Sequence, residues 1–169
     1  CLVGCTDPQV RIMAYRALRS MNTAEQSWAN VIPQFGADFN NYEHANVHVC
    51  AAALRAFNVL PPDQLEAALR KVGPAIKPCA TCSSSIIRTA AVEMCGLMLL
   101  EHISPAAAAA SSERELFADL WTIILESIFD ENPYVCLASA EIVRRTFVKA
   151  LASRGGSPSS YSEALVGNE

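Results

Sequence analysis

Paired cysteines are the residues of this sequence whose type and spacing are best suited to chemistry. Cys79-Ala-Thr-Cys82 has the CxxC spacing that forms half of a zinc site or a redox pair. A structural zinc ion needs four ligands, and no second CxxC pair is present, so zinc would have to recruit side chains such as Cys50 or His48. We therefore expect Cys79 and Cys82 to lie in a loop as two reduced thiols, with no metal and no cofactor.

Two histidines form the other pair with a ligand-like spacing. His44 and His48 are four residues apart and would share a helix face, as the metal ligands of an HExxH motif do. The glutamate that acts as general base in that motif is missing, because Ala, Asn and Val separate the two histidines. The sequence also lacks a GxSxG motif and a glycine-rich phosphate loop. We expect no catalytic residues and no enzymatic activity.

Composition restricts the remaining classes of protein. Hydrophobic residues make up 51% of the 169 residues and charged residues 18%, which is typical of a packed protein. The 13 basic residues against 17 acidic ones give a net charge of -4, so we expect no nucleic-acid partner. Three of the seven cysteines, Cys50, Cys95 and Cys136, lie in apolar helical patterns, where free cysteine behaves as a small hydrophobic residue. These features favour a reduced, cytoplasmic protein.

No segment has the pattern of a transmembrane span or a signal peptide. The most apolar stretch, 86–103, is interrupted by Arg88, Glu93 and Glu101, whereas a span needs about 20 apolar residues. The chain begins with Cys1 rather than Met, and we therefore expect it to be a fragment of a longer protein.

The elements that would position these residues are helices that begin in a repeated way. In "DPQVR", Asp7 is a favoured N-cap, Pro8 suits the first helical turn, and Val10 starts an apolar stripe that continues through Ala14, Ala17, Leu18 and Met21. Similar patterns are centred on Val47, Ile87 and Val135, so the four anchors are 37, 40 and 48 residues apart. The N-caps expected for these three helices are His44, Ser84 and Asn132.

A second set of helices is expected between the first set, so that two kinds of helix alternate, and no segment has the two-residue alternation of a strand. Trp28 and Trp121 lie on apolar stripes of this second set and are expected in the core. Pro33 and Gly36 are expected to bend or stop the first of these helices. The three helices of the second set are indicated by a capping box at Thr23 and Gln26, an apolar run from Asp63 that ends at Gly73-Pro74, and a capping box at Ser112 and Glu115. We expect 105–111 and 153–169 to be unstructured.

A period near 40 residues built from two helices predicts an all-α protein, an α-solenoid of about four antiparallel helical hairpins over residues 1–152, followed by a flexible Ser/Gly-rich tail over 153–169. The first hairpin would lack its first helix. Asp-Pro-x-Val-Arg, with Ala four residues after the Val, resembles the second helix of a HEAT repeat. That resemblance implies contacts between repeats or with a partner through Asp7, Arg11 and Arg88. A continuous ladder of such contacts is not expected, since His48 and Cys136 occupy the matching basic positions.

The order of three stretches resembles the adaptin-like trunks of the plant TPLATE/TSET endocytic coat complexes. The stretches are "ADFNNYEHANVHVCAAALRAFNVLP", "IIRTAAVEMCGLMLLEH" and "LWTIILESIFDENPYVCLASAEIVRRTF". The resemblance implies a non-catalytic scaffold in clathrin-mediated endocytosis that binds coat and adaptor subunits and clathrin, and that is recruited from the cytoplasm to the plasma membrane through its complex. The alternative is a HEAT scaffold of another class, such as a nuclear transport receptor or a phosphatase scaffold. Arginines on the repeated helices, with few acids beside them, weigh against a transport receptor with an acidic inner surface.

Overall fold

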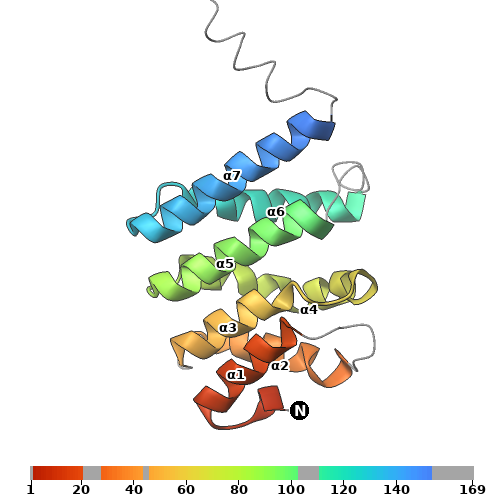
Figure 1. Ribbon diagram of the computed structural model, residues 1–169, viewed down its shortest axis with the longest axis vertical. Helices are drawn as coiled ribbons and strands as arrows, with labels where there is room; N and C mark the ends of the chain where they lie inside the picture. Colours follow the sequence, from red (N-terminus) through yellow and green to blue (C-terminus); the bar gives the residue numbers. More distant parts are fainter. Residues whose placement is uncertain (1, 21–27, 44–45, 103–110, 154–169) are drawn as a thin grey trace, which may run out of the picture.

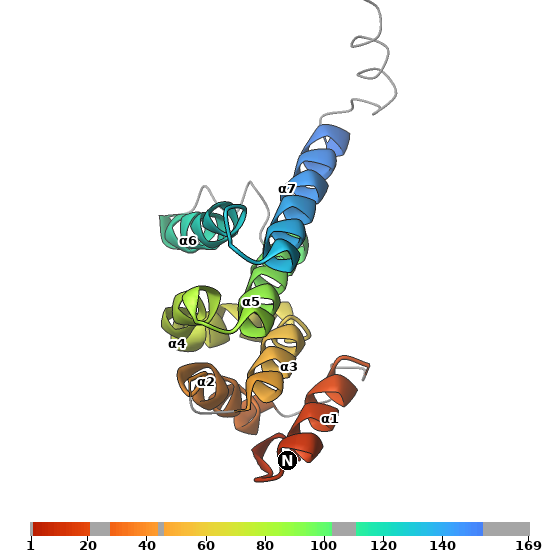
Figure 2. The same cartoon turned by 90° about the vertical axis from the view of Figure 1, so that its left-hand side faces the viewer.

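The computed structural model describes residues 2–20, 28–43, 46–102 and 111–153, and all regular secondary structure in these ranges is helical. The helices form two layers (Figures 1 and 2). The layer that we call the B layer contains α1 (Pro8–Leu18), α3 (Val47–Phe57), α5 (Ser85–Leu97) and α7 (Pro133–Ser153). The A layer contains α2 (Ile32–Asn40), α4 (Pro62–Thr81) and α6 (Ser111–Ser127). The short elements are η1 (Leu2–Gly4), η3 (Trp28–Asn30) and the π-helical turn η4 (Met98–His102).

Successive helices of each layer stack on one another. In the B layer α1 packs on α3, α3 on α5 and α5 on α7, and in the A layer α2 packs on α4 and α4 on α6. Helices α2 and α3, α4 and α5, and α6 and α7 form three consecutive hairpins. The prediction of an all-α chain with two alternating kinds of helix is confirmed for the described residues, and the stack is compatible with an α-solenoid.

Asparagine and aspartate side chains start three of the four B-layer helices, while α5 begins after Ser84, whose side chain makes no capping hydrogen bond. Asp7 Oδ1 accepts a hydrogen bond from Gln9 N at 2.8 Å, and Asn46 Oδ1 accepts one from His48 N at 2.9 Å. Asn132 does the same for Tyr134 N at 3.0 Å. These bonds satisfy amides of the first turn, which have no partner within the helix.

The expected N-cap of α3 was wrong. Asn46, not His44, caps this helix, and His44 lies outside the described residues. The anchor three residues after the cap is therefore Val49, which is buried, rather than Val47, which is half-buried. With this correction the anchors Val10, Val49, Ile87 and Val135 are 39, 38 and 48 residues apart, so the first two intervals are almost equal.

Prolines do not stop the A-layer helices where the sequence indicated. Helix α4 continues through Pro74 and Pro78 to Thr81, and it begins after Pro61 instead of being capped by Asp63. Its apolar face packs against α2 and α5, and this burial outweighs the amide that each proline lacks. Likewise Pro33 stands in the first turn of α2, where no amide is needed, so it starts that helix instead of bending it.

The buried core runs along the boundary between the two layers. At one end Tyr15, Phe35, Phe39 and Phe57 form an aromatic cluster with ring centroids 5.3 to 6.0 Å apart. The centre is helix α5, whose buried residues cover most of its length. Aromatic contacts of this kind add to the hydrophobic stabilisation of the helix that contributes them.

The apolar stripe of α1 differs from the expected one. Ile12, Tyr15 and Leu18 are its buried residues, whereas Val10 is only half-buried and Ala17 is exposed. Tyr15 stacks on Phe35 in the aromatic cluster, so the buried face of α1 is the one that carries Tyr15. Met21, Thr23 and Gln26 lie outside the described residues.

The two tryptophans lie in different surroundings. Trp28 is buried in η3, as expected of a core residue. Trp121 is only half-buried in α6, where its ring packs edge-to-face against Phe117 with the ring centroids 6.3 Å apart. The expectation that both are core residues is thus met in full by Trp28 alone. Residues 105–110 and the tail beyond Ser153 lie outside the described ranges, and Ser111 belongs to α6.

Candidate functional site

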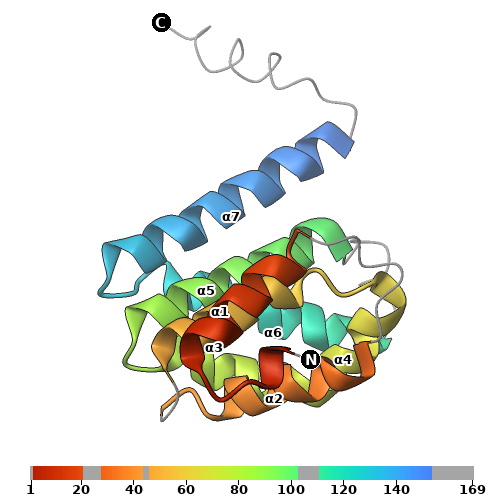
Figure 3. The ribbon, with the colours of Figure 1, turned by 60° about the horizontal axis from the view of Figure 1, so that its bottom comes forward.

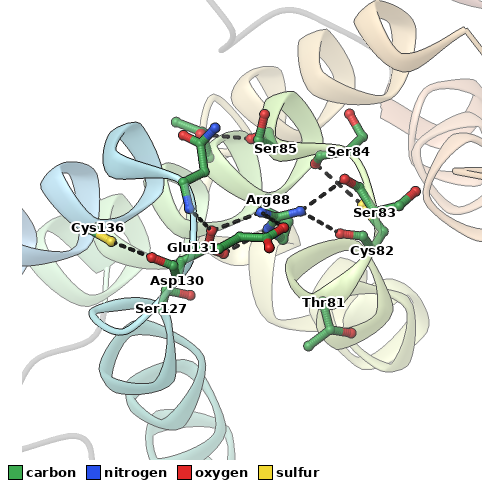
Figure 4. Close-up of polar contacts among 12 residues, drawn as sticks. Thr81, Cys82, Ser83, Ser84, Ser85, Arg88, Ser127, Asp130, Glu131 and Cys136 are labelled. Carbon is green, nitrogen blue, oxygen red and sulfur yellow. Dashed lines mark hydrogen bonds and ion pairs between the residues drawn. The ribbon is translucent and has the colours of Figure 1, made fainter.

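Arg88 occupies a polar junction between two hairpins of the stack. It lies in α5, and its Nε and Nη2 atoms donate to the two carboxylate oxygens of Asp130, at 2.7 and 2.8 Å, in the turn between α6 and α7 (Figure 4). Its Nη1 donates to the carbonyl oxygens of Cys82 and Ser83, at 2.9 and 3.0 Å, at the start of α5. Glu131 Oε1 lies 3.6 Å from Nη2 and is exposed. One guanidinium therefore ties the α4–α5 turn to the α6–α7 turn.

The ion pair changes the titration of both partners. Hydrogen bonding to Asp130 raises the pKa of Arg88 above its ordinary value, and hydrogen bonding to Arg88 lowers the pKa of Asp130. Asp130 also accepts a hydrogen bond from Asn132 N at 2.8 Å, which stabilises its charged form. Both groups are charged at neutral pH, and bidentate pairing fixes the orientation of Arg88. A cavity of about 350 Å³ borders this pair and is lined by both turns.

Arg11 makes the corresponding contact in the first hairpin junction. It lies in α1 and forms an ion pair with Asp38, a buried residue of α2, and its Nε donates to Val3 O at 3.1 Å. Tyr15 Oη donates to the same carboxylate at 2.5 Å, and burial raises the pKa of this tyrosine. Asp38 is thus a buried carboxylate that is satisfied by an arginine and a phenol, which is the arrangement that buried charge requires.

The residues that make these contacts stand at one equivalent position of the B-layer helices. Arg11, Cys50, Arg88 and Cys136 each stand four residues after the N-cap of their B-layer helix. The first three each reach the following A-layer hairpin, and their respective partners are Asp38, Cys79 and Asp130. Cys136 instead donates to the carbonyl oxygen of Asp130, 2.8 Å away.

Asp7 lies apart from these junctions. It is exposed, and among the described residues its carboxylate bonds only to the first turn of its own helix. Asp7 and Arg11 therefore do not form rungs of one ladder. The acids that pair with the arginines, Asp38 and Asp130, come from other elements and were not singled out in the sequence. No local pattern marks them, because each lies in a different hairpin from its arginine.

The CxxC cysteines are not together in a loop. Cys79 is buried within α4, where its thiol bonds to Phe39 O at 3.5 Å and shares a hydrogen bond with Cys50. Cys82 is half-buried at the C-terminal cap of α4, and its thiol lies 3.6 Å from Ser84 O. The expectation of a loop with two thiols was wrong for Cys79, because α4 extends through it.

The chemistry of the cysteines follows from their burial. The hydrogen bond to Cys79 and burial raise the pKa of Cys50, and burial raises the pKa of Cys95 to about 12. These thiols are protonated at neutral pH and are therefore weak nucleophiles. Within the described ranges no three His, Cys, Asp or Glu side chains are grouped closely enough to hold a metal ion, and His48 is exposed in a groove between α1 and α3.

Arginines line two adjoining grooves on the outer side of the B layer. The first groove, about 270 Å³, runs between α1 and α3 past Arg16, Arg19 and Arg55. The second, about 370 Å³, continues from Arg19 and Arg55 toward α7 and Arg145. Arg55 Nε bonds to Glu93 Oε2 of α5 at 2.6 Å, whereas Arg16 and Arg19 make no ion pair with any described residue. Ile12 and Met13 also line the first groove, and Met94, Leu97, Glu93 and Glu141 also line the second. The surface therefore offers apolar contact together with charge that is mainly positive in the first groove and mixed in the second.

Comparison with known proteins gives no assignment: no protein-family model, no curated protein and no solved structure matches this chain. None of the described helices is both long enough and apolar enough to cross a bilayer.

Proposed function

We propose that this chain is a non-catalytic scaffold, a HEAT/ARM-like α-solenoid segment that forms part of the trunk of an endocytic adaptor or coat subunit of the TPLATE/TSET type. In this proposal it acts in clathrin-mediated endocytosis, binds coat subunits and clathrin, and reaches the plasma membrane from the cytoplasm through its complex. The observation that supports it best is the stack itself, in which one register position of successive B-layer helices contacts the next hairpin.

The grooves of the B layer support a protein partner. Solenoids bind partners along extended surfaces that run across several repeats, and the two grooves together extend from α1 to α7. Arg16 and Arg19, which make no ion pair with a described residue, are suited to carboxylate groups of a partner, because guanidinium groups bind carboxylates through two hydrogen bonds. Arg55 lies between them and α5, where it is paired with Glu93. A transport receptor would present an acidic face to basic cargo, whereas arginines outnumber acids along the two grooves, with Arg16, Arg19, Arg55 and Arg145 against Glu93 and Glu141.

Affinity capture from plant or algal lysate tests the proposal. The 169-residue chain is expected to retain coat subunits and clathrin, and a variant with Arg16→Glu, Arg19→Glu and Arg55→Glu is expected to lose most of that signal. A matched control carries Lys71→Glu and Lys77→Glu, which reverse charge on exposed positions of α4 in the A layer. Recovery of a transport cargo or a phosphatase subunit in place of coat subunits would contradict the proposal and favour a HEAT scaffold of another class.

A further inference from the structure

The outer side of α7 is largely apolar, and no other described helix covers it. Helix α5 lies between two B-layer neighbours, α3 and α7, but α7 contacts a B-layer helix on one side only. No described helix lies beyond it (Figures 1 and 3). On that side Tyr134, Leu137, Phe147 and Val148 are 74%, 67%, 66% and 44% exposed. Apolar side chains exposed together on one helix face commonly mark an interaction surface.

The residues of this face have the spacing of a helix-pairing seam. Six of them are separated by alternating steps of three and four residues, which is the a and d pattern of a heptad repeat. The opposite side of the helix carries Val135, Ser139 and Ile142, which are buried in the stack. We call the six residues the α7 stripe: Tyr134, Leu137, Glu141, Arg144, Val148 and Leu151.

The order of chemical types in the α7 stripe is symmetric. From either end it reads two apolar residues, one charged residue, one residue of opposite charge, and two apolar residues. When a second copy lies antiparallel with the centre between Glu141 and Arg144, Leu137 faces Val148 of the other copy. In the same register each Glu141 faces an Arg144, whereas a parallel pair would place like charges together. We propose that α7 is the interface of a homodimer in which two copies of the helix pack antiparallel.

Neighbouring residues fit the same arrangement. Phe147 flanks the stripe on the side of Ala140, which is small and exposed, so each Phe147 has room against the other copy. Glu141 and Arg144 pair within the chain through two 2.7 Å hydrogen bonds, and both remain largely exposed. Because both groups stay exposed while they are paired, each can also bond to its counterpart across the twofold axis, and no unpaired charge would be buried. An isologous contact of this kind closes on itself and produces dimers instead of fibres.

The contact is small. The stripe spans 18 residues, or about 27 Å of helix at 1.5 Å per residue. One helix from each copy buries less than the roughly 1,200 Å² at which stable interfaces begin. We therefore expect a dissociation constant in the range of about 1 to 100 μM. A small buried interface area gives a binding free energy that only slightly exceeds the entropy cost of association.

Charge-reversal variants of the whole 169-residue chain, compared by analytical ultracentrifugation, test the dimer. The unmodified chain is expected to dimerise, while E141R and R144E are each expected to weaken self-association at least tenfold by placing like charges together. An equimolar mixture of E141R and R144E is expected to restore a dimer, because every position across the axis then pairs opposite charges. Arg16→Glu provides the control, since it makes the same reversal on α1.

Three results would overturn the proposal. One is a chain that stays monomeric at 300 μM. Another is a dimer that neither E141R nor R144E weakens, which would place the contact on a different surface. The third is a mixture of the two variants that remains as weakly associated as each alone, since this excludes the antiparallel register. These outcomes are independent of whether the chain binds coat subunits.

Discussion

At the scale of single residues, Asp130 and Arg88 show how one ion pair makes a joint between hairpins. Arg88 is almost fully buried and bonds to Asp130 and to two carbonyl oxygens, so no donor on its Nε or Nη1 is left without an acceptor. Glu131 approaches the same guanidinium but stays 88% exposed at its side chain. The two acids are neighbours in sequence, which allows a matched comparison between a buried and an exposed partner.

We expect Asp130→Asn to lower the free energy of unfolding by about 3 kcal/mol at pH 7, since it leaves the charge of Arg88 without its counter-ion. The pKa of Asp130 is lowered in the folded state, so its contribution is present above the pKa of the unfolded chain and is lost as the pH falls through the folded pKa. The difference from the unmodified chain is thus expected to shrink below about pH 4.

Urea denaturation followed by circular dichroism at several pH values measures this difference. Glu131→Gln is the control, and we expect it to change stability by less than about 0.5 kcal/mol because exposed pairs contribute little. If Asp130→Asn cost the same at pH 2.5 as at pH 7, the ion pair would not be the source of the loss.

The sequence predicted the arginines of these joints but not their acids. Arg11 and Arg88 follow from the repeated helix start, which is a local pattern. Asp38 and Asp130 depend on how one hairpin sits on the next, and that packing has no signature within a few residues. Cys79 was misplaced for a related reason, because the stretch that favours a loop, Gly73-Pro74, lies in a helix whose burial outweighs local propensity.

At the scale of elements, the approach of α5 to α7 depends on a glycine. A Cβ atom added to Gly96 would lie 2.5 Å from Cγ1 of Ile142, far inside van der Waals contact. Ile142 is buried, and its side chain occupies the space that Gly96 leaves open. Gly73 in α4 differs, because apart from its chain neighbours a Cβ added there meets nothing within 4 Å.

We expect Gly96→Ala to destabilise the fold by about 1 to 3 kcal/mol, since Ile142 would have to move within a packed interface. Gly73→Ala is expected to change stability by less than about 1 kcal/mol, because the helix preference of alanine is opposed by the contact of its Cβ with the ring of Pro74, the next residue. Thermal melts of the two variants beside the unmodified chain provide the measurement. The steric explanation fails if both substitutions shift the melting temperature in the same direction by the same amount.

Helix starts were easier to predict than helix ends. Asp7 and Asn132 were found from their side chains, and the error at α3 was a shift of two residues, from His44 to Asn46. The ends of α2 and α4 were harder, because proline near a helix start and proline inside a buried helix look alike in sequence. Only packing distinguishes the two cases.

At the scale of the whole molecule, stability is distributed along a stack. Helix α5 packs on α3, α4, α6 and α7, whereas α1 packs mainly on α3 and η1 and reaches α2 only through Arg11 and Tyr15. In such a chain each hairpin is stabilised mainly by its neighbours, so the ends open more readily than the centre.

We expect amide hydrogen exchange to be slowest in the middle of α5 and at least about tenfold faster in the middle of α1 and of α7, because local opening costs less where one neighbour is missing. Mass spectrometry at a protein concentration below 1 μM measures this while avoiding protection of α7 by dimers. Equal protection in α1, α5 and α7 would indicate one cooperative unit and would contradict this picture.

The general architecture followed from the period of the helix starts, and it needed no knowledge of contacts. The outward face of α7 could not be predicted in the same way. Its stripe of residues is recognised only once Val135, Ser139 and Ile142 are known to face inward.

The alternation of arginine and cysteine at one register position also has a mechanical consequence. The joints at Arg11 and Arg88 are held by ion pairs, while the joint between them, at Cys50 and Cys79, is held by two buried thiols. A chain pulled from its ends in acid would yield first at the two charged joints, whose carboxylates become neutral. The block from α2 to α5 lies between these two joints and would stay folded longest.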